Sequence, residues 1–142
     1  MTLAELLATN PDWPTSLTDA LALTWLEESV NTWRDLSQSE MLRWCAVHNI
    51  IARFESLEED ADAVIQSIAK AGIVLITSSN GLEATNAETR TMMTTMRAKN
   101  MVTQAQLDDL IERATVQMPR WQDGGVSPQP TIGYIAVARA QA

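Results

Sequence analysis

Apolar residues recur every three or four positions over most of residues 1–118, which is the spacing of amphipathic helices. At five expected helix starts, Ser or Thr is followed three residues later by Glu, Asp or Gln, the pattern of a capping box. The first residues of these five pairs are Thr2, Ser16, Ser37, Ser56 and Thr103. We predict that a helix begins close to each of them.

Residues 85–114 show the pattern most clearly, as two helices joined by a turn at residues 99–103. The amide of Gln106 can bond back to the backbone of Thr103, and Val102 can pack on Leu107 across the turn. This combination of capping box and hydrophobic staple predicts where the second helix starts. Its apolar spacing continues to Met118, and Pro119 ends it.

Three further helices are expected in the first half of the chain, after a short one that begins at Thr2. The first covers residues 16–35. The second covers residues 37–54 and is apolar over most of its circumference, which is typical of a central helix. The third begins at Ser56 and ends at Gly72, because glycine favours the left-handed conformation found after helix C-termini.

Two segments are ambiguous. Residues 73–77 suit a short strand or a buried irregular or helical segment, and without an earlier strand to pair with we favour the second. Residues 132–142 begin with strand-like alternation and end in helix-forming alanines, and we favour a short helix. Between them, residues 119–131 contain three prolines and a glycine pair, which is typical of an extended arm.

Together these patterns predict a mainly α protein, a compact helical bundle of five to seven helices with an extended C-terminal arm that contains Gly and Pro. We expect a helical domain at residues 1–118 and the arm, ending in a short helix or strand, at residues 119–142. A chain of 142 residues has the size expected for one domain with a tail.

The charge is unevenly distributed. Residues 1–70 contain 12 acidic and 4 basic residues, whereas residues 71–142 contain 6 of each. This acidic excess disfavours direct binding of nucleic acid, because phosphate contacts depend on Lys and Arg. The acids are densest at residues 55–62, which we interpret as a solvated helix face, with mimicry of a phosphate backbone as the alternative. No apolar run approaches the roughly 20 residues that a membrane span requires, so no membrane partner is expected.

Few residues suggest catalysis. Cys45 and His48 are one helical turn apart and could form a nucleophile–base pair or bind a metal. We favour a core cysteine and a histidine bonded to a backbone carbonyl. Acids four positions apart within residues 55–62 could hold a cation or act in acid–base catalysis, but a solvated face is favoured. We therefore predict no catalytic residue, no cofactor and no metal, and a protein that is not an enzyme.

Aromatic residues suggest a protein interface. Trp25, Trp33 and Trp44 fit helix faces and are interpreted as core residues. Trp121 lies in the arm, and Trp and Arg are frequent anchors of interfaces; packing of Trp121 onto its own domain is the alternative. The residues predicted to contact a partner are Arg120, Trp121, Ile132, Tyr134 and Ile135.

A series of short matches runs through the second half of the chain. They are Thr89-Arg90, Val102-Thr103-Gln104-Ala105-Gln106-Leu107, Arg120-Trp121, and an ending with Thr131, Ile135 and Ala138-Arg139-Ala140. On these residues, the stretch of about 81–140 resembles small proteins from the virion or tail gene region of tailed bacteriophages. The resemblance implies a virion setting. Most of those proteins have no assigned activity, so it supplies no functional residues.

The expected function is that of a non-enzymatic bacteriophage virion-associated protein of the tail or head–tail region, acting through protein–protein contacts. Expected partners are other virion or assembly proteins, with a homo-oligomer left open, and the expected location is the virion after synthesis in the host bacterial cytoplasm. One alternative is a small acidic inhibitor of a host nucleic-acid enzyme. Another is an assembly chaperone that binds through the methionine cluster Met92, Met93, Met96 and Met101, although core filling is favoured for these residues.

Overall fold

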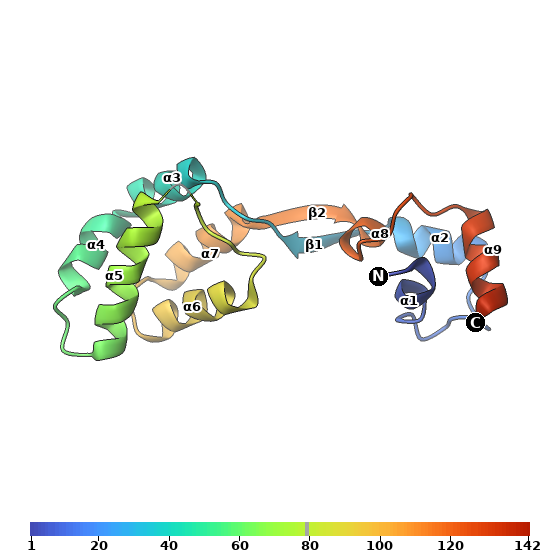
Figure 1. The fold of residues 1–142 in the computed structure, drawn as a ribbon, viewed down its shortest axis with the longest axis horizontal. Coiled ribbons are helices and arrows are strands. Elements are labelled where there is room, and N and C mark those ends of the chain that lie inside the picture. Colours follow the sequence, from blue (N-terminus) through green and yellow to red (C-terminus); the bar gives the residue numbers. More distant parts are fainter. Residues whose placement is uncertain (79) are drawn as a thin grey trace. The chain divides into compact units, whose positions relative to one another are not determined.

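The computed structural model describes residues 1–78 and 80–142 and is mainly helical, as the sequence predicts (Figure 1). It also contains a two-stranded sheet of β1 (Ser29–Trp33) and β2 (Thr115–Pro119). Both strands fall in stretches that were predicted to be helical.

The chain divides into two compact units. Unit 1 combines the two chain ends, Met1–Thr32 and Gln117–Ala142, and unit 2 is the continuous segment Trp33–Val116. This differs from the predicted division into a domain at residues 1–118 and an arm at residues 119–142. The physical reason is that the core of unit 1 needs side chains from both ends of the chain.

Unit 1 contains α1 (Leu3–Leu7), α2 (Asp19–Glu27), α8 (Arg120–Asp123) and α9 (Ile132–Gln141). Both α1 and α2 pack on α9. Helices this short gain most of their stability from tertiary packing of this kind. Its core residues are Leu6, Leu7, Leu17, Ala22, Leu26, Val126, Ile135 and Ala138. The C-terminal residues are therefore part of a packed unit rather than an extended arm, and the short helix favoured for residues 132–142 is present.

Unit 2 contains five helices among its described residues. They are α3 (Gln38–His48), α4 (Ile50–Leu57), α5 (Ala63–Thr77), α6 (Ala87–Ala98) and α7 (Gln104–Arg113). The helix α3 contacts α4, α5 and α7, whereas α5 contacts α3, α4 and α6. These two helices share the central position that the apolar pattern predicted for residues 37–54 alone.

Three of the predicted capping boxes are present. In each, the hydroxyl of the cap residue accepts a hydrogen bond from the N–H three residues on, and that residue's side chain accepts one from the cap N–H. The pairs are Thr2 with Glu5, Ser37 with Glu40, and Thr103 with Gln106. Such signals are local in sequence, so they can be recognised without knowledge of the tertiary structure.

Two predicted helix starts are wrong. Thr18 caps α2 in place of Ser16, and Asp62 caps α5 in place of Ser56. Ser56 lies inside α4, where its hydroxyl donates to the carbonyl of Arg53. In both helices the true cap is the residue whose oxygen reaches the free N–H groups of the first turn.

Two predicted helices are interrupted. The helix expected over residues 16–35 ends at Glu27, and the chain continues as β1. The helix expected over residues 37–54 breaks at Asn49, which has a left-handed φ of 53° and separates α3 from α4. Asparagine tolerates this conformation better than most residues.

Gly72 does not end a helix. The helix α5 continues through it to Thr77, so residues 73–77 are helical, which is within the favoured alternative. A Cβ atom at Gly72 would lie 2.6 Å from Cε2 of Phe54, a buried residue of α4. The glycine is therefore needed for close packing of the two helices and not for a left-handed turn.

Candidate binding surface

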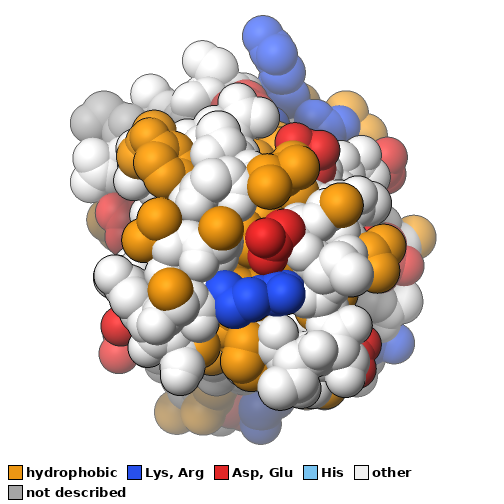
Figure 2. Space-filling view, turned by 90° about the vertical axis from the view of Figure 1, so that its right-hand side faces the viewer, with side chains coloured by type: hydrophobic (Ala, Val, Ile, Leu, Met, Phe, Trp, Pro, Cys, Tyr) orange, Lys and Arg blue, Asp and Glu red, His pale blue; other side chains and the backbone are white. Residues whose placement is uncertain are grey.

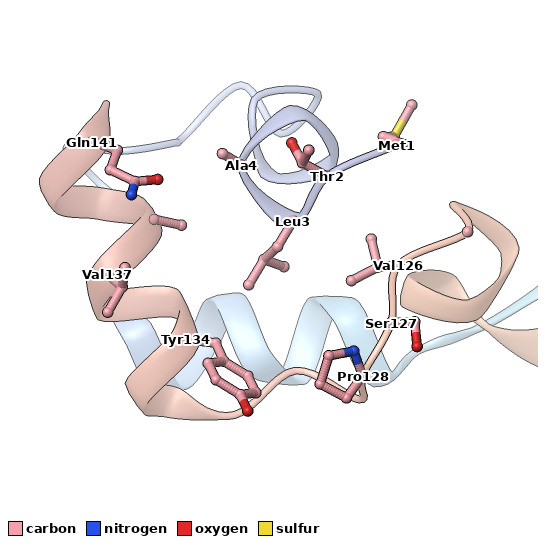
Figure 3. A pocket seen from close by; sticks show the side chains of 12 residues that line it. Met1, Thr2, Leu3, Ala4, Val126, Ser127, Pro128, Tyr134, Val137 and Gln141 are labelled. Carbon is pink, nitrogen blue, oxygen red and sulfur yellow. The ribbon is translucent and has the colours of Figure 1, made fainter.

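A groove of about 530 Å³ opens on unit 1, between the start of α1, the segment that follows α8, and one side of α9 (Figure 3). Leu3 points from α1 into this space, and Val126 lines it from the opposite segment. Tyr134 and Val137 line it from α9. The lining is mostly apolar and contains no acidic or basic side chain.

The sequence of α9 explains why an apolar surface remains. Ile135 and Ala138 are buried in the core, whereas Ile132, Tyr134 and Val137 are 50%, 49% and 57% exposed. Figure 2 shows apolar side chains in several patches on the face of this unit that is turned toward the viewer, with an acidic and a basic group side by side between them. Exposed apolar side chains that gather beside a groove mark a binding site more often than isolated ones do.

The surroundings of the groove are acidic. Unit 1 contains 6 acidic and 2 basic residues, and both basic residues form ion pairs inside the unit, at 3.0 and 3.3 Å. Glu5 lines a hollow that shares Ala4 and Gln141 with the groove. Glu27 lines another hollow, together with Ile132 of α9. The groove therefore adjoins a hollow with an acidic side chain, that of Glu5, in a unit that carries an excess of acidic residues.

Three of the five residues predicted to contact a partner are used inside unit 1. Arg120 donates to the carbonyl oxygen of Trp25 at 2.6 Å, and its guanidinium lies 4.3 Å from the centre of the Trp25 ring. Trp121 is half-buried against the core, and Ile135 is fully buried. The other two residues, both exposed on α9, stay predicted partner contacts.

Sequence reasoning missed most of the residues that line the groove, among them Leu3, Val126 and Val137. Val126 follows a glycine pair in a segment that was interpreted as an arm, so nothing local indicated its burial. Val137 had a weak signal, because α9 carries more apolar residues than one helix face can bury.

Cys45 and His48 do not form a reactive pair. Cys45 is 1% exposed, and burial raises the pKa of its thiol to about 11, which disfavours the nucleophilic thiolate. Nε2 of His48 lies 2.7 Å from Oδ2 of Asp109, and Arg113 donates to Oδ1 of Asp109 at 3.2 Å. The bond to His48 is the main cause that lowers the pKa of the Asp109 carboxyl. His48 therefore connects α3 to a carboxylate of α7 rather than to the backbone carbonyl that was predicted.

The acids at residues 55–62 do not share one helix face. The helix α4 ends at Leu57, so the expected pairs four positions apart do not form. Asp62 caps α5 and pairs with Lys99 at 3.0 Å, and this bond is the main cause that lowers the pKa of its carboxyl. Asp60 accepts a hydrogen bond from the N–H of Asp62 at 2.8 Å. Two of the acids thus have structural roles in the turn.

The expected core tryptophans differ in burial. Trp44 is 1% exposed and donates from Nε1 to the carbonyl of Gln106 at 2.9 Å. Trp25 and Trp33 are only half-buried, and each has an arginine over its ring. Of the methionine cluster, Met93, Met96 and Met101 are buried in the core of unit 2, so these three fill the core as favoured.

Within the described part of the chain, no helix is long and apolar enough to cross a membrane. Nor do three His, Cys, Asp or Glu side chains of the described residues come together as metal ligands. Comparisons with protein-family models, with curated proteins and with solved structures found no match.

Proposed function

We propose that this protein is a non-enzymatic binding protein whose unit 1 groove receives an apolar segment of a partner protein that also carries basic residues. The observation that carries this proposal is the apolar lining between α1 and α9, set in a unit with a net side-chain charge of −4. Burial of such side chains supplies the favourable free energy of association.

The acidic surroundings support a basic partner. Glu5, Asp12, Glu27 and Asp123 are exposed and form no ion pair within unit 1, all of whose residues are described. Opposite charge on the partner would increase the association rate and would select against acidic competitors. The charge therefore supplies specificity, and the groove supplies affinity.

We further propose that the partner is another virion or assembly protein of a tailed bacteriophage, in the tail or head–tail region. The resemblance of about residues 81–140 to small phage proteins supports this setting. The acidic inhibitor has less support, because Asp60 and Asp62 organise the turn that would have to imitate phosphates. The chaperone has less support, because most methionines of its binding cluster lie in the core.

The test is a pair of matched substitutions in the phage that encodes the protein. Val137→Glu introduces a charge at the groove, and Val74→Glu introduces the same charge on α5; the two valines are 57% and 65% exposed. Both variants are expected to remain folded, because neither side chain is buried. Mass spectrometry of purified particles should detect the native protein and the Val74→Glu variant, but at least tenfold less of the Val137→Glu variant.

Two results would contradict the proposal. Equal incorporation of both variants would show that the groove is not the contact surface. Presence of the native protein in infected-cell extract alone, with none in particles, would rule out the virion setting. The melting temperatures of the purified variants provide the control, since they should agree with that of the native protein.

A further inference from the structure

We infer that the partner segment carries a Lys or Arg close in sequence to the apolar residue that fills the groove, and that this basic side chain pairs with Glu5. This inference rests on the proposed function and specifies which acidic residue of unit 1 the partner meets. It starts from the hollow of about 490 Å³ beside the groove, which Glu5 lines.

The hollow continues the groove. Ala4 of α1 and Gln141 of α9 line both spaces (Figure 3). Along the first turn of α1, Leu3 lines the groove, Ala4 lines both spaces and Glu5 lines the hollow. A ligand that extends from the groove past Ala4 therefore meets the side chain of Glu5.

The charge in this hollow is that of Glu5. Among the lining residues, all of which are described, Glu5 has the only charged side chain. Its carboxylate forms no ion pair with any described residue. A basic side chain in the hollow would therefore gain an opposite charge that the protein itself leaves unpaired.

The carboxylate of Glu5 is held in position before a ligand binds. Its Oε2 accepts a hydrogen bond from the N–H of Thr2 at 2.7 Å, as part of the capping box of α1. This bond is the main cause that lowers the pKa of the Glu5 carboxyl, so the group keeps its negative charge at neutral pH. A side chain that is already fixed loses little conformational entropy on binding.

Glu27 is placed less well for a ligand in the groove. It lines another hollow together with Ile132 and Gly133, at the start of α9, and that hollow shares no lining residue with the groove. Successive residues of a helix are about 100° apart, so Ile132 is about 160° around α9 from Tyr134, which lines the groove. The hollow of Glu27 therefore lies on another side of α9.

The test substitution is Glu5→Gln, which removes the charge and keeps the helix cap. Glutamine can accept the hydrogen bond from Thr2, as Gln106 does from Thr103 at the start of α7. Glu27→Gln removes the same charge from the other hollow. Both glutamates are exposed, so both variants should have the melting temperature of the native protein.

The experiment uses the full chain and short random peptides selected from a display library for binding to it. The probe is the strongest synthetic peptide from that selection, and calorimetry measures its affinity. We expect a Lys or Arg close to an apolar residue in the selected peptides, and binding that Val137→Glu removes. Glu5→Gln should weaken binding about fivefold, which is the upper range for an exposed ion pair, and Glu27→Gln should leave it unchanged.

A second peptide, in which Gln replaces the basic residue, identifies the pair. It should bind the native protein about fivefold more weakly than the probe does. The Glu5→Gln variant should bind both peptides equally well, because a pair that has already lost one partner cannot be weakened again by loss of the other.

The outcomes separate this inference from the proposed function. If Glu27→Gln, and not Glu5→Gln, made the two peptides equal, the assignment of Glu5 would be wrong and the groove would remain the binding site. Selected peptides that need Val137 but contain no basic residue would also overturn the inference. Selection that yields no peptide sensitive to Val137→Glu would overturn the proposed function as well.

Discussion

Unit 2 is a continuous stretch of chain, whereas unit 1 is closed by two segments from opposite ends. Among the described residues, the core of unit 2 contains 18 buried residues, and that of unit 1 contains 8. The smaller unit also leaves three apolar residues of α9 about half exposed, and two of them, Tyr134 and Val137, line the groove. The comparison teaches that the unit with fewer buried core residues is the one that carries the apolar groove between α1 and α9.

The largest expected effect comes from removal of residues 119–142. This deletion takes Val126, Ile135 and Ala138 from the core of unit 1 and none from the core of unit 2. We expect unit 1 to unfold and unit 2 to stay folded, because loss of even one large core side chain costs about 2–5 kcal/mol. The NMR signals of the indole N–H groups measure this. The signal of Trp25 should shift to its random-coil position, and that of Trp44 should not shift.

A matched control for the deletion is residues 33–116 expressed alone. This segment contains the whole of unit 2 and should show the same Trp44 signal. If the deletion left the Trp25 signal in its native position, unit 1 would not depend on the C-terminal segment. The claim that unit 1 needs both ends of the chain would then be wrong.

An intermediate effect is expected from the same substitution in each unit. Gly72→Ala should destabilise unit 2 by about 1–3 kcal/mol, because the new Cβ would contact the buried ring of Phe54. Gly133→Ala should stabilise unit 1 by about 0.5–1 kcal/mol, because the closest atom to its Cβ is the Thr131 hydroxyl oxygen at 3.7 Å. Denaturant unfolding followed at tryptophans of each unit gives both values.

A second substitution sharpens the interpretation of Gly72. Phe54→Leu shortens the side chain that the new Cβ would contact, so adding it to Gly72→Ala should cost less than the sum of the two single changes. Strict additivity would show that Gly72 acts through helix propensity and not through the close approach of α4 and α5.

The smallest effect on stability is expected from lowering the pH. In unit 2 the pKa values of four carboxyl groups, those of Asp35, Glu40, Asp62 and Asp109, are lowered in the folded state, and in unit 1 that of Glu5 is lowered. A hydrogen bond from Arg34 is the main cause that lowers the pKa of Glu40 to about 2. A lowered pKa means that the stabilisation is complete above the unfolded-state value and is lost as pH falls through the folded-state value.

Unit 2 should therefore lose more stability than unit 1 as the pH falls from about 4.5, the ordinary value for glutamate, to about 2. Thermal unfolding followed at Trp44 and Trp121 measures this separately for the two units. Glu40→Gln should remove part of the acid sensitivity of unit 2 and leave unit 1 unchanged. Parallel loss of stability in the two units would contradict the prediction.

Prediction from sequence succeeded where the signal was local. The Thr103 and Ser37 capping boxes lie within single helix turns, and both were identified correctly. It failed at β1, because a strand with Val, Thr and Trp is stabilised by β2, which is distant in the sequence. In the candidate site, Tyr134 was identified from its segment, whereas Leu3 and Val126 gave no sign that they line one groove.

By itself, the sequence determined the helical character of the chain, three of its capped helix starts and its acidic charge, since each depends on neighbouring residues or on composition. Only the tertiary structure decided that the two chain ends form one unit, that Gly72 lets α5 approach α4, and that α9 has a buried and an exposed apolar side. The physical reason is that apolar burial has no direction: an apolar pattern shows that a residue needs cover, and the folded chain determines which segment supplies it.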